Sequence, residues 1–219
     1  MIPEEYRESL QYADYQKEQA DLRAKRQETL IFCEHPPTIT GGVQWKAQNL
    51  RQQPDELEKN GIPLVPIKRG GDLTAHEPGQ LVIYPHIDLK RRKIPLSDYF
   101  HALLSISAQA VEDYCSVALE MRRDYPGLYF GERKVAAIGI EARSFFTSSG
   151  IAINVSNDLS TFAHIVACGL RQFVPGTLSQ ITSDTLSPRT LAEHWSKRFQ
   201  AFLDPSLSHT SDIRLIESN

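Results

Sequence analysis

The pattern of apolar and polar residues along the chain predicts several helices. Residues 95–119 and 187–203 carry the clearest apolar stripes at helical spacing. In the first segment, after Ser97 as N-cap, we expect a buried face made of Phe100, Leu103, Leu104, Ser107, Val111, Tyr114 and Ala118. In the second, after Ser187 as N-cap and Pro188 at the first helical position, we expect buried Leu191, Trp195, Phe199 and Phe202. Weaker patterns predict a surface helix over residues 10–27 and short helices within 51–61 and 161–169.

Continuous apolar runs rich in β-branched and aromatic residues predict strands in two parts of the chain. The first part holds residues 28–37, which end at a Pro-Pro pair, and then residues 62–69 and 81–89. The second part holds residues 127–130, 134–143, 144–146 and 150–155, joined by short turns, one of them at Ser148-Ser149. Tight connections favour antiparallel pairing, and the strands do not alternate regularly with helices. The sequence therefore predicts an α+β fold with a mixed, largely antiparallel central sheet and flanking helices.

Length and composition fit a single soluble domain over residues 1–219, with a loose, Ser-rich tail from about residue 204. The net charge of −3 gives no electrostatic reason to expect binding to nucleic acid. No apolar run approaches the ~18 residues that cross a bilayer, and the N-terminus lacks the features of a signal peptide, so we expect no membrane partner. The cysteines at 33, 115 and 168 are odd in number and far apart, which favours a reducing cytoplasm. Neither they nor the histidines have the spacing of a metal site, so no metal is expected.

Residues 69–80 form an unusual loop, RGGDLTAHEPGQ, directly before a predicted strand. Its paired glycines allow backbone shapes that side chains forbid. The loop lacks the GxxxxGK[ST] pattern of a phosphate-binding loop, and it does not open a helix as a GxGxxG dinucleotide turn does. His76 in this loop, like His35 in CEHPP, is either a functional group or a histidine that makes an ordinary hydrogen bond.

Two other residues are candidates for chemistry. Cys168 is followed by Gly169 between predicted elements, so a substrate can approach the thiol, although a lone cysteine is also commonly a small buried hydrophobic residue. Lys134 begins a predicted strand whose alternation places it on the same face as Ala136 and Ile138. The small residues that follow it in the strand leave room for a flat or linear group beside the lysine. The alternative interpretation is an ordinary solvated lysine at the edge of a strand.

Several segments resemble, in order, the lipoyl (octanoyl) transferases of lipoate biosynthesis. They are CEHPPTITGG, RGGDLTAHEPGQLVIYPHIDL, DYPGLYFGERKVAAIGI, GIAINVSNDLSTF and ACG, and the resemblance runs from about Leu30 to Ile181. It implies a fold similar to the catalytic domain of the biotin and lipoate protein ligases. It also implies an acyltransferase that moves an octanoyl group from octanoyl-acyl carrier protein to a specific lysine of a lipoyl domain through a cysteine thioester. That reaction is the first step of endogenous protein lipoylation.

The resemblance also assigns roles to particular residues. Cys168 matches the cysteine that carries the acyl group, and Lys134 matches the lysine that assists it. The residues implied to line the acyl site are Arg69, Gly70, Gly71, Asp72, Leu73, Thr74, Ala75, His76, Ala137, Ile138, Gly139, Gly150, Ile151 and Ala152, with His35 in a supporting role. The implied acceptors are lipoyl domains of 2-oxoacid dehydrogenase complexes or the glycine cleavage H protein. No cofactor is expected, because a thioester donor makes amide formation downhill without ATP.

Two positions depart from the family pattern, and one cluster suggests a partner surface. Glu77 stands where the family usually has glycine, which would bring a negative charge near the site, and Ala167 stands where it usually has proline. The cluster Lys90-Arg91-Arg92-Lys93 is either a solvated face or a surface that attracts an acidic carrier protein.

Three alternative functions are compatible with the same residues. An ATP-dependent lipoate protein ligase shares the fold but needs no cysteine nucleophile, so dependence on ATP separates it from the transferase. An octanoyl amidotransferase takes its acyl group from another lipoyl-bearing protein. A non-catalytic module that binds acyl carrier protein forms no covalent adduct with the acyl group.

Overall fold

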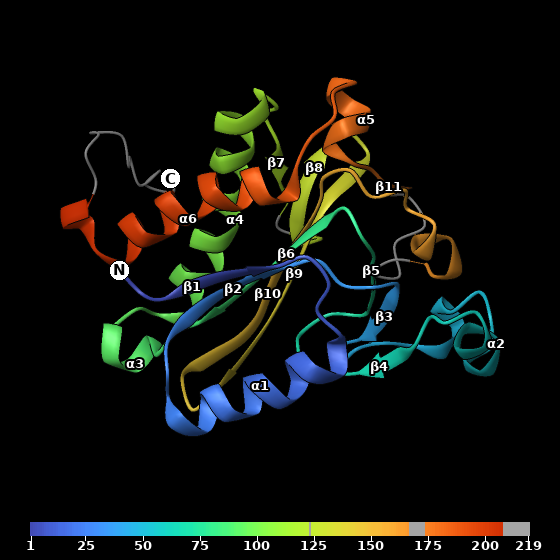
Figure 1. Ribbon diagram of the computed structural model, residues 1–219, viewed down its shortest axis with the longest axis horizontal. Helices are drawn as coiled ribbons and strands as arrows, with labels where there is room; N and C mark the ends of the chain where they lie inside the picture. The colour runs from blue at the N-terminus through green and yellow to red at the C-terminus, as the bar shows by residue number, and fades with distance from the viewer. Residues whose placement is uncertain (123, 167–173, 208–219) are drawn as a thin grey trace.

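The computed structural model, which describes residues 1–122, 124–166 and 174–207, has an α+β architecture (Figure 1). The larger sheet runs in the order β1-β2-β6-β10-β9-β8-β7, and β11 also pairs with β9. Its strands are β1 (Glu4–Arg7), β2 (Thr29–Cys33), β6 (Gln80–His86), β7 (Glu120–Met121), β8 (Gly127–Phe130), β9 (Arg133–Arg143), β10 (Phe146–Asn154) and β11 (Val174–Pro175). The β1–β2 and β9–β11 pairs are parallel, and the other pairs of this sheet are antiparallel within the described part of the chain. The predicted mixed, largely antiparallel sheet is confirmed.

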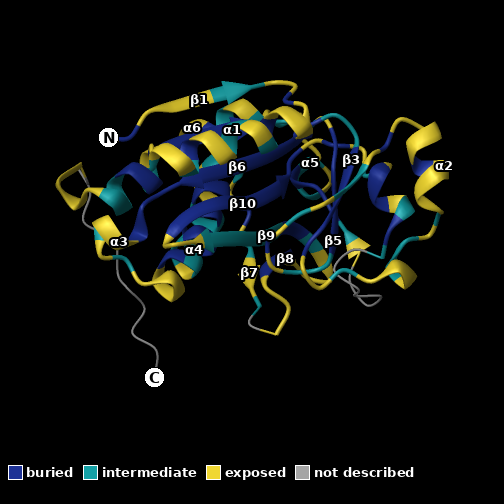
Figure 2. Ribbon diagram, turned by 90° about the horizontal axis from the view of Figure 1, so that it is seen from below, coloured by how far each residue is buried: buried dark blue, intermediate teal, exposed yellow. Residues whose placement is uncertain are grey.

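Helices cover both faces of this sheet (Figure 1). Helix α1 (Tyr12–Lys25) lies across one face, whereas α4 (Leu96–Cys115) and α6 (Pro188–Leu203) pack together on the other. Strands β6 and β10 are buried between these layers, and α1 shows a largely exposed outer surface (Figure 2). The shorter helical elements are α2 (Pro54–Lys59), α3 (Leu89–Arg92), α5 (Leu178–Thr182), η1 (Ala47–Asn49), η2 (Thr161–His164) and η4 (Pro205–Leu207). No helix among the described residues is long and apolar enough to cross a bilayer.

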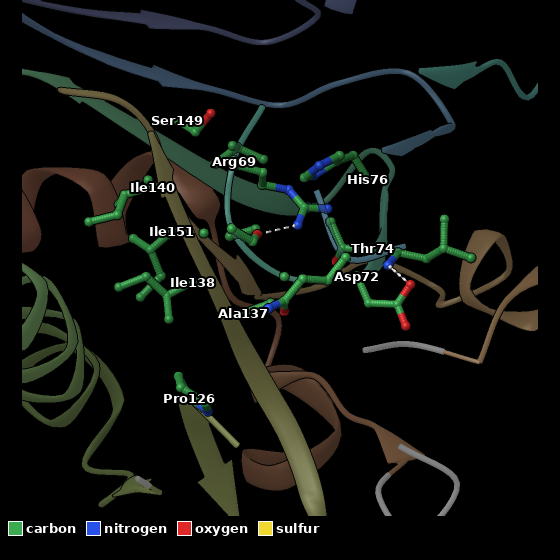
Figure 3. Close-up of a pocket in the computed structure, with 18 of the residues that line it drawn as sticks. Arg69, Asp72, Thr74, His76, Pro126, Ala137, Ile138, Ile140, Ser149 and Ile151 are labelled. Atoms are coloured by element: carbon green, nitrogen blue, oxygen red, sulfur yellow. Dashed lines mark hydrogen bonds between the residues drawn. The ribbon is translucent and has the colours of Figure 1, made fainter. Parts of the chain in front are cut away.

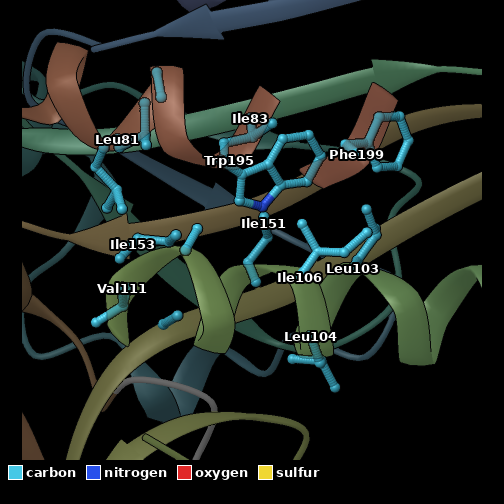
Figure 4. Packing of buried hydrophobic residues seen from close by; sticks show 14 of the residues in the cluster. Leu81, Ile83, Leu103, Leu104, Ile106, Val111, Ile151, Ile153, Trp195 and Phe199 are labelled. Carbon is cyan, nitrogen blue, oxygen red and sulfur yellow. The ribbon is translucent and has the colours of Figure 1, made fainter. Parts of the chain in front are cut away.

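The main core lies between the sheet and the helix pair α4 and α6 (Figure 4). Trp195 is fully buried there, with its ring edge-on to Phe32 at 5.8 Å and stacked on Phe199 at 4.7 Å. Its indole Nε1 donates a hydrogen bond of 2.8 Å to Ser107 Oγ, which explains why a serine occupies the buried stripe of α4. The predicted packing of Leu103, Val111, Trp195 and Phe199 is confirmed, and Phe100 joins the same core half-buried.

Two local predictions were wrong. Helix α4 takes Pro95 as its N-cap and ends at Cys115, so Ser97 lies inside the helix and Ala118 lies beyond it, exposed. Ser148 and Ser149 form no turn, because β10 continues through them without a break. Ser149 adopts φ 60° within the strand, and its N–H donates to the Tyr15 hydroxyl at 3.1 Å, which satisfies the backbone at this kink.

A second, smaller sheet lies beside the first and runs in the order β4-β3-β5. Its strands are β3 (Thr38–Gly41), β4 (Leu64–Pro66) and β5 (Leu73–His76). The sequence did not predict β3, and β5 falls inside the stretch that was predicted to be a loop. Thr38 pairs with His76 and Gly41 with Leu73, so β3 holds residues 73–76 in a fixed, extended conformation. Of the predicted loose tail, residues 205–207 form η4, and residues from 208 onward lie outside the described part of the chain.

Candidate active site

A pocket of about 420 Å³ lies beside β9 and β10, where residues 69–76 pass over them (Figure 3). Most of the expected acyl-site residues line it: Arg69, Gly70, Gly71, Asp72, Leu73, Thr74, His76, Lys134, Ala137, Ile138, Gly139, Gly150, Ile151 and Ala152. The sequence did not assign the other lining residues to the site; they are Tyr12, Gln44, Val82, Tyr84, Phe100, Asp124, Tyr125, Pro126, Ile140 and Ser149. Ala75 is not on the pocket wall, because its side chain packs into a separate core with Ile39 and Leu57. Cys168 lies outside the described residues, so its place relative to the pocket stays a prediction.

Small residues form the floor of the pocket. Gly150 is opposite Gly139, and Ala152 is opposite Ala137, in the antiparallel pairing of β10 with β9. Directly opposed residues in such a pair point to the same face of the sheet. Ala152 packs with Val82 in the smaller core under α1, so this face is the one that α1 covers. These glycine and alanine residues form a low wall of the pocket, which we call the glycine-alanine trough, although Arg69 Cδ packs directly on Gly139 and the Ile83 carbonyl on Gly150.

A β-bulge turns Lys134 toward this trough. Ala136 and Lys134 face successive residues of β8, so Val135 between them is an extra residue on β9. Val135 and Ala136 both lie in the main core, which breaks the alternation of the strand. Lys134 therefore shares the pocket face with Ala137, and the expectation that it faces the same side as Ala136 and Ile138 was wrong. A prediction that assumes strict alternation cannot detect a β-bulge.

The amine of Lys134 has a defined position at the pocket. Its Nζ donates to the Pro126 carbonyl at 3.1 Å and lies 5.5 Å from the centre of the Tyr129 ring. Gly127 makes this position accessible, because a Cβ there would lie 2.6 Å from Lys134 Cε. The glycine of the GLYF segment thus lets the lysine side chain cross β8.

Arg69 crosses the other side of the pocket and is buried despite its charge. Its Nη2 donates to the Thr40 carbonyl at 3.0 Å and to Thr40 Oγ1 at 2.9 Å, and its Nη1 donates to the Gly70 carbonyl at 2.9 Å. Gly139 has no side chain to block this path, since a Cβ there would meet Arg69 Cδ at 2.7 Å. Gly70 N in turn donates to the Ile140 carbonyl at 3.2 Å and ties the loop to β9. Of the paired glycines, Gly71 adopts φ 89°, a conformation that favours glycine, whereas a Cβ at Gly70 would meet no described atom within 4 Å.

His76 is held neutral within a chain of hydrogen bonds that ends at Arg69. Its Nδ1 lies 2.8 Å from Gln80 Oε1, and its Nε2 lies 3.3 Å from Thr40 Oγ1. The Gln80 amide group donates to the Ala75 carbonyl, so Oε1 is the acceptor and His76 Nδ1 carries the proton. Burial lowers the pKa of His76 to about 3, which removes it as a proton donor near neutral pH. Its structural effect is to orient the Thr40 hydroxyl that holds Arg69.

His35 does not line the pocket but supports a residue that does. Its Nδ1 donates to the Leu10 carbonyl at 2.5 Å, so Nε2 accepts from the Tyr84 hydroxyl at 2.8 Å. Tyr84 lines the pocket and stacks on Tyr15 at 3.8 Å. Burial lowers the pKa of His35 to about 4, so this histidine is also neutral.

Glu77 does not bring its charge to the pocket wall. It is 2% exposed, and its carboxylate accepts from Asn157 Nδ2 at 2.7 Å and from Thr161 N at 2.8 Å. The side chain turns toward residues 157–161, and a negative charge near Cys168 stays a prediction, because Cys168 lies outside the described residues. Ala167, the other departure from the family pattern, lies outside the described residues.

The basic cluster at residues 90–93 is partly used within the fold. Arg91 and Arg92 pair with the buried Glu28 at 2.5 Å and 2.7 Å, whereas Lys90 and Lys93 are exposed. Attraction of an acidic partner by this cluster stays a prediction, and the two lysines are its most accessible charges. No group of acidic, histidine or cysteine side chains suited to a metal ion occurs in residues 1–122, 124–166 and 174–207.

The fold places the chain with a known class of catalytic domains. A bipartite lipoate protein ligase from Thermoplasma acidophilum superposes with a TM-score of 0.67 at 15% identity, over 93% of this chain and 84% of that one. A lipoate-protein ligase A bound with ATP gives a TM-score of 0.69 at 16% identity, over 91% and 86%. The biotin protein ligase of Aquifex aeolicus gives 0.53 at 15% identity, over 94% and 73%. The predicted likeness to biotin and lipoate protein ligase catalytic domains is confirmed.

Sequence comparison then identifies the family. The Lipoyl protein ligase A/B catalytic domain matches residues 5–200. A curated octanoyltransferase from Leptospira interrogans is 45% identical over 168 residues, which are 75% of this chain and 78% of that protein. Another, from Solibacter usitatus, is 37% identical over 200 residues, which are 89% and 90% of the two chains. The chain belongs to the lipoyl protein ligase A/B catalytic domain family and is an acyltransferase, as its sequence motifs predicted.

Proposed function

We propose that this protein transfers an octanoyl group from octanoyl-acyl carrier protein to a specific lysine of a lipoyl domain, through a thioester on Cys168. The observation that carries the proposal is the position of the Lys134 amine at one end of a pocket floored by glycine and alanine. The similarity to curated octanoyltransferases supports the same acyl group. The acceptors are lipoyl domains of 2-oxoacid dehydrogenase complexes or the glycine cleavage H protein.

The reaction proceeds in two balanced steps. The Cys168 thiolate attacks the carbonyl carbon of the octanoyl thioester, the new C–S bond forms as the bond to the carrier sulfur breaks, and the carrier leaves as a thiolate that takes a proton from water. The neutral amine of the acceptor lysine then attacks the acyl-enzyme, an amide forms, and Cys168 leaves as the thiolate. Lys134 stabilises the thiolate in the free enzyme and relays the proton that the acceptor amine loses. Both steps start from a thioester, so no ATP is consumed.

Two further features of the described residues support this proposal. The chain on either side of Cys168 is held near the site, since Val166 N donates to the Asn49 carbonyl at 2.7 Å and Pro175 pairs with Lys134. Cys33 and Cys115 are free thiols, as expected in the reducing cytoplasm to which we assign the protein.

The test is an intact-mass measurement after the protein is mixed with octanoyl-acyl carrier protein without ATP. One octanoyl adduct is expected on Cys168, and it should pass to an added lipoyl domain. Cys168→Ala should abolish the adduct, while Cys33→Ala and Cys115→Ala should retain it. Transfer that requires ATP and proceeds in Cys168→Ala would identify a ligase, and an adduct that forms only from octanoylated lipoyl protein would identify an amidotransferase. Binding of the carrier protein without any adduct would identify a non-catalytic module.

A further inference from the structure

We propose that Glu77 is a positioning residue, whose buried carboxylate fixes residues 157–166 against the pocket strand β5. The proposal rests on the proposed function, because residues 157–166 lead directly into Cys168. In the described parts of the structure, Glu77 neither lines the pocket nor pairs with a cation, and its carboxylate bonds only to Asn157 and Thr161.

Glu77 joins two segments that are far apart in sequence. It follows His76, the last residue of β5 and part of the pocket wall. One carboxylate oxygen accepts from the Asn157 side-chain amide at 2.7 Å, and the other accepts from the backbone N–H of Thr161 at 2.8 Å. Thr161 is the first residue of η2.

The neighbours of Glu77 extend the same junction. Gly79 accepts from Ser156 N at 3.0 Å, and Gln80 Nε2 donates to Asn154 Oδ1 at 2.9 Å. Gly79 has φ 87°, and a Cβ there would meet Asn157 N at 2.6 Å, so only glycine permits this approach. Residues 77–80 are thus bonded along their length to residues 154–161. We call this junction the clasp.

Further backbone hydrogen bonds follow the clasp along the stretch of chain that leads to Cys168. After η2, His164 accepts from Arg51 N at 2.9 Å, Ile165 bridges Leu50, and Val166 N donates to the Asn49 carbonyl. These contacts are backbone bonds of one short stretch, and the Glu77 carboxylate anchors its beginning. Loss of the carboxylate would remove the acceptor of the buried Thr161 N–H and leave Asn157 Nδ2 with its longer bond, 3.3 Å, to Asn154 Oδ1, which favours local opening of this stretch. A displacement of about 1 Å at a reacting group costs on the order of 100-fold in rate.

The chain provides a matched control in Glu34. Its carboxylate also holds the segment 77–80, because Oε2 accepts from Gly79 N at 2.7 Å, while Oε1 accepts from the Tyr6 hydroxyl at 2.8 Å. Glu34 makes no bond to residues 157–161 among the described contacts. Glu34→Ala therefore removes a comparable set of bonds without releasing the stretch that leads to Cys168.

The experiment compares wild type, Glu77→Ala, Glu77→Gln and Glu34→Ala in single-turnover octanoyl loading and in amide hydrogen exchange. Glu77→Ala should load about 100-fold more slowly with a donor KM within about 2-fold of wild type, and residues 157–166 should exchange at least about 10-fold faster. Glu77→Gln should recover most of the rate, because an amide oxygen still accepts from Thr161 and the Asn157 amide can turn. Glu34→Ala should load at the wild-type rate.

Three results would overturn the proposal: wild-type loading in Glu77→Ala, equal losses in Glu77→Ala and Glu34→Ala, or unchanged exchange of residues 157–166. If Glu77→Ala does not fold, slower loading and faster exchange in Glu77→Gln than in Glu34→Ala would support the clasp, and the reverse order would refute it. A wild-type protein that never loads would refute the proposed function, and the exchange comparison would still decide whether Glu77 fixes the stretch.

Discussion

The amine of Lys134 lies at the pocket because neighbouring residues give it both direction and space. The extra residue Val135 sets which side of β9 it faces, and Gly127 leaves room for its side chain to cross β8. The Pro126 carbonyl and the face of Tyr129 then hold the cation in place. We propose that its positive charge stabilises the thiolate of Cys168.

Replacing Lys134 should therefore slow acyl loading mainly by removing that charge. Lys134→Ala is expected to lower the loading rate at pH 7 by about 100-fold or more. Raising the pH toward 9 should recover part of the loss, because a free thiol with a pKa near ~8.5 then ionises unaided. Rapid-quench loading assays across this pH range would measure the effect. Exposed Lys68, beside the same loop, is a suitable control, and an equal loss in Lys68→Ala would contradict the assignment.

A second prediction concerns the addition of a single methyl group at Gly139. A methyl group at this position would lie 2.7 Å from Arg69 Cδ and 3.0 Å from the Gly70 carbonyl, so the loop must move away from β9. Gly139→Ala should reduce turnover by at least about 10-fold while the protein stays folded. Transfer assays and circular dichroism, measured together, would check this. Normal turnover in Gly139→Ala would show that Arg69 has no fixed role at the pocket.

At the scale of elements, the sequence predicted best those segments whose stability depends on burial of a regular apolar pattern. The residues of α6 predict both of its ends, and the residues of β6 predict a strand. Ser187 caps α6 by accepting from Thr190 N at 3.4 Å. The sequence missed β3 and β5, because both are short and depend on pairing with distant segments, β3 with β4 and β5, and β5 with β3. Most of the residues that the family motifs mark for the acyl site nevertheless line the pocket. The pocket residues Tyr12 and Tyr84 were missed, since nothing in a helix or strand pattern distinguishes a tyrosine at a site from one in a core.

The packing of α6 on α4 depends strongly on Trp195. Trp195→Ala should lower the free energy of unfolding by about 3–5 kcal/mol, because it leaves a large cavity beside Phe32 and Phe199. Trp195→Phe, which keeps most of the ring volume and loses the bond to Ser107, should cost less, on the order of 1–2 kcal/mol. Urea unfolding curves would give both values. Equal destabilisation by the two variants would contradict the view that ring volume dominates.

At the scale of the whole molecule, the face of the sheet under α1 is unusual because it buries several histidines. Burial lowers the pKa of His35 to about 4, of His76 to about 3 and of His86 to about 4. Each therefore stays neutral in the folded protein at pH values where the unfolded chain, with a pKa near ~6.5, takes up a proton.

Stability should consequently fall as the pH drops. Because the unfolded state binds more protons below pH ~6.5, the free energy of unfolding is at its full value above that pH and decreases toward pH ~4. Each histidine contributes a slope of about 1.4 kcal/mol per pH unit within this window. Denaturant unfolding at pH 8, 7, 6 and 5 would measure the total slope. His86→Phe, which places an apolar ring against Tyr15 and Phe146, should reduce it by about one histidine's share. A stability that does not change between pH 8 and 5 would rule out neutral buried histidines as its source.

The extra residue in β9 has a consequence for how this protein tolerates change in length. The side chains of β9 alternate in one phase before Val135 and in the opposite phase after it. Lys134 belongs to the first phase, and the glycine-alanine trough belongs to the second. Deleting Val135 would restore a single alternation with Lys134 still on the pocket face, but it would bring the amine one residue closer to the trough and remove a side chain from the main core. The strand can exchange residues of similar size at many positions, but its count of residues between the lysine and the glycine-alanine trough is as much a part of the chemistry as the amine.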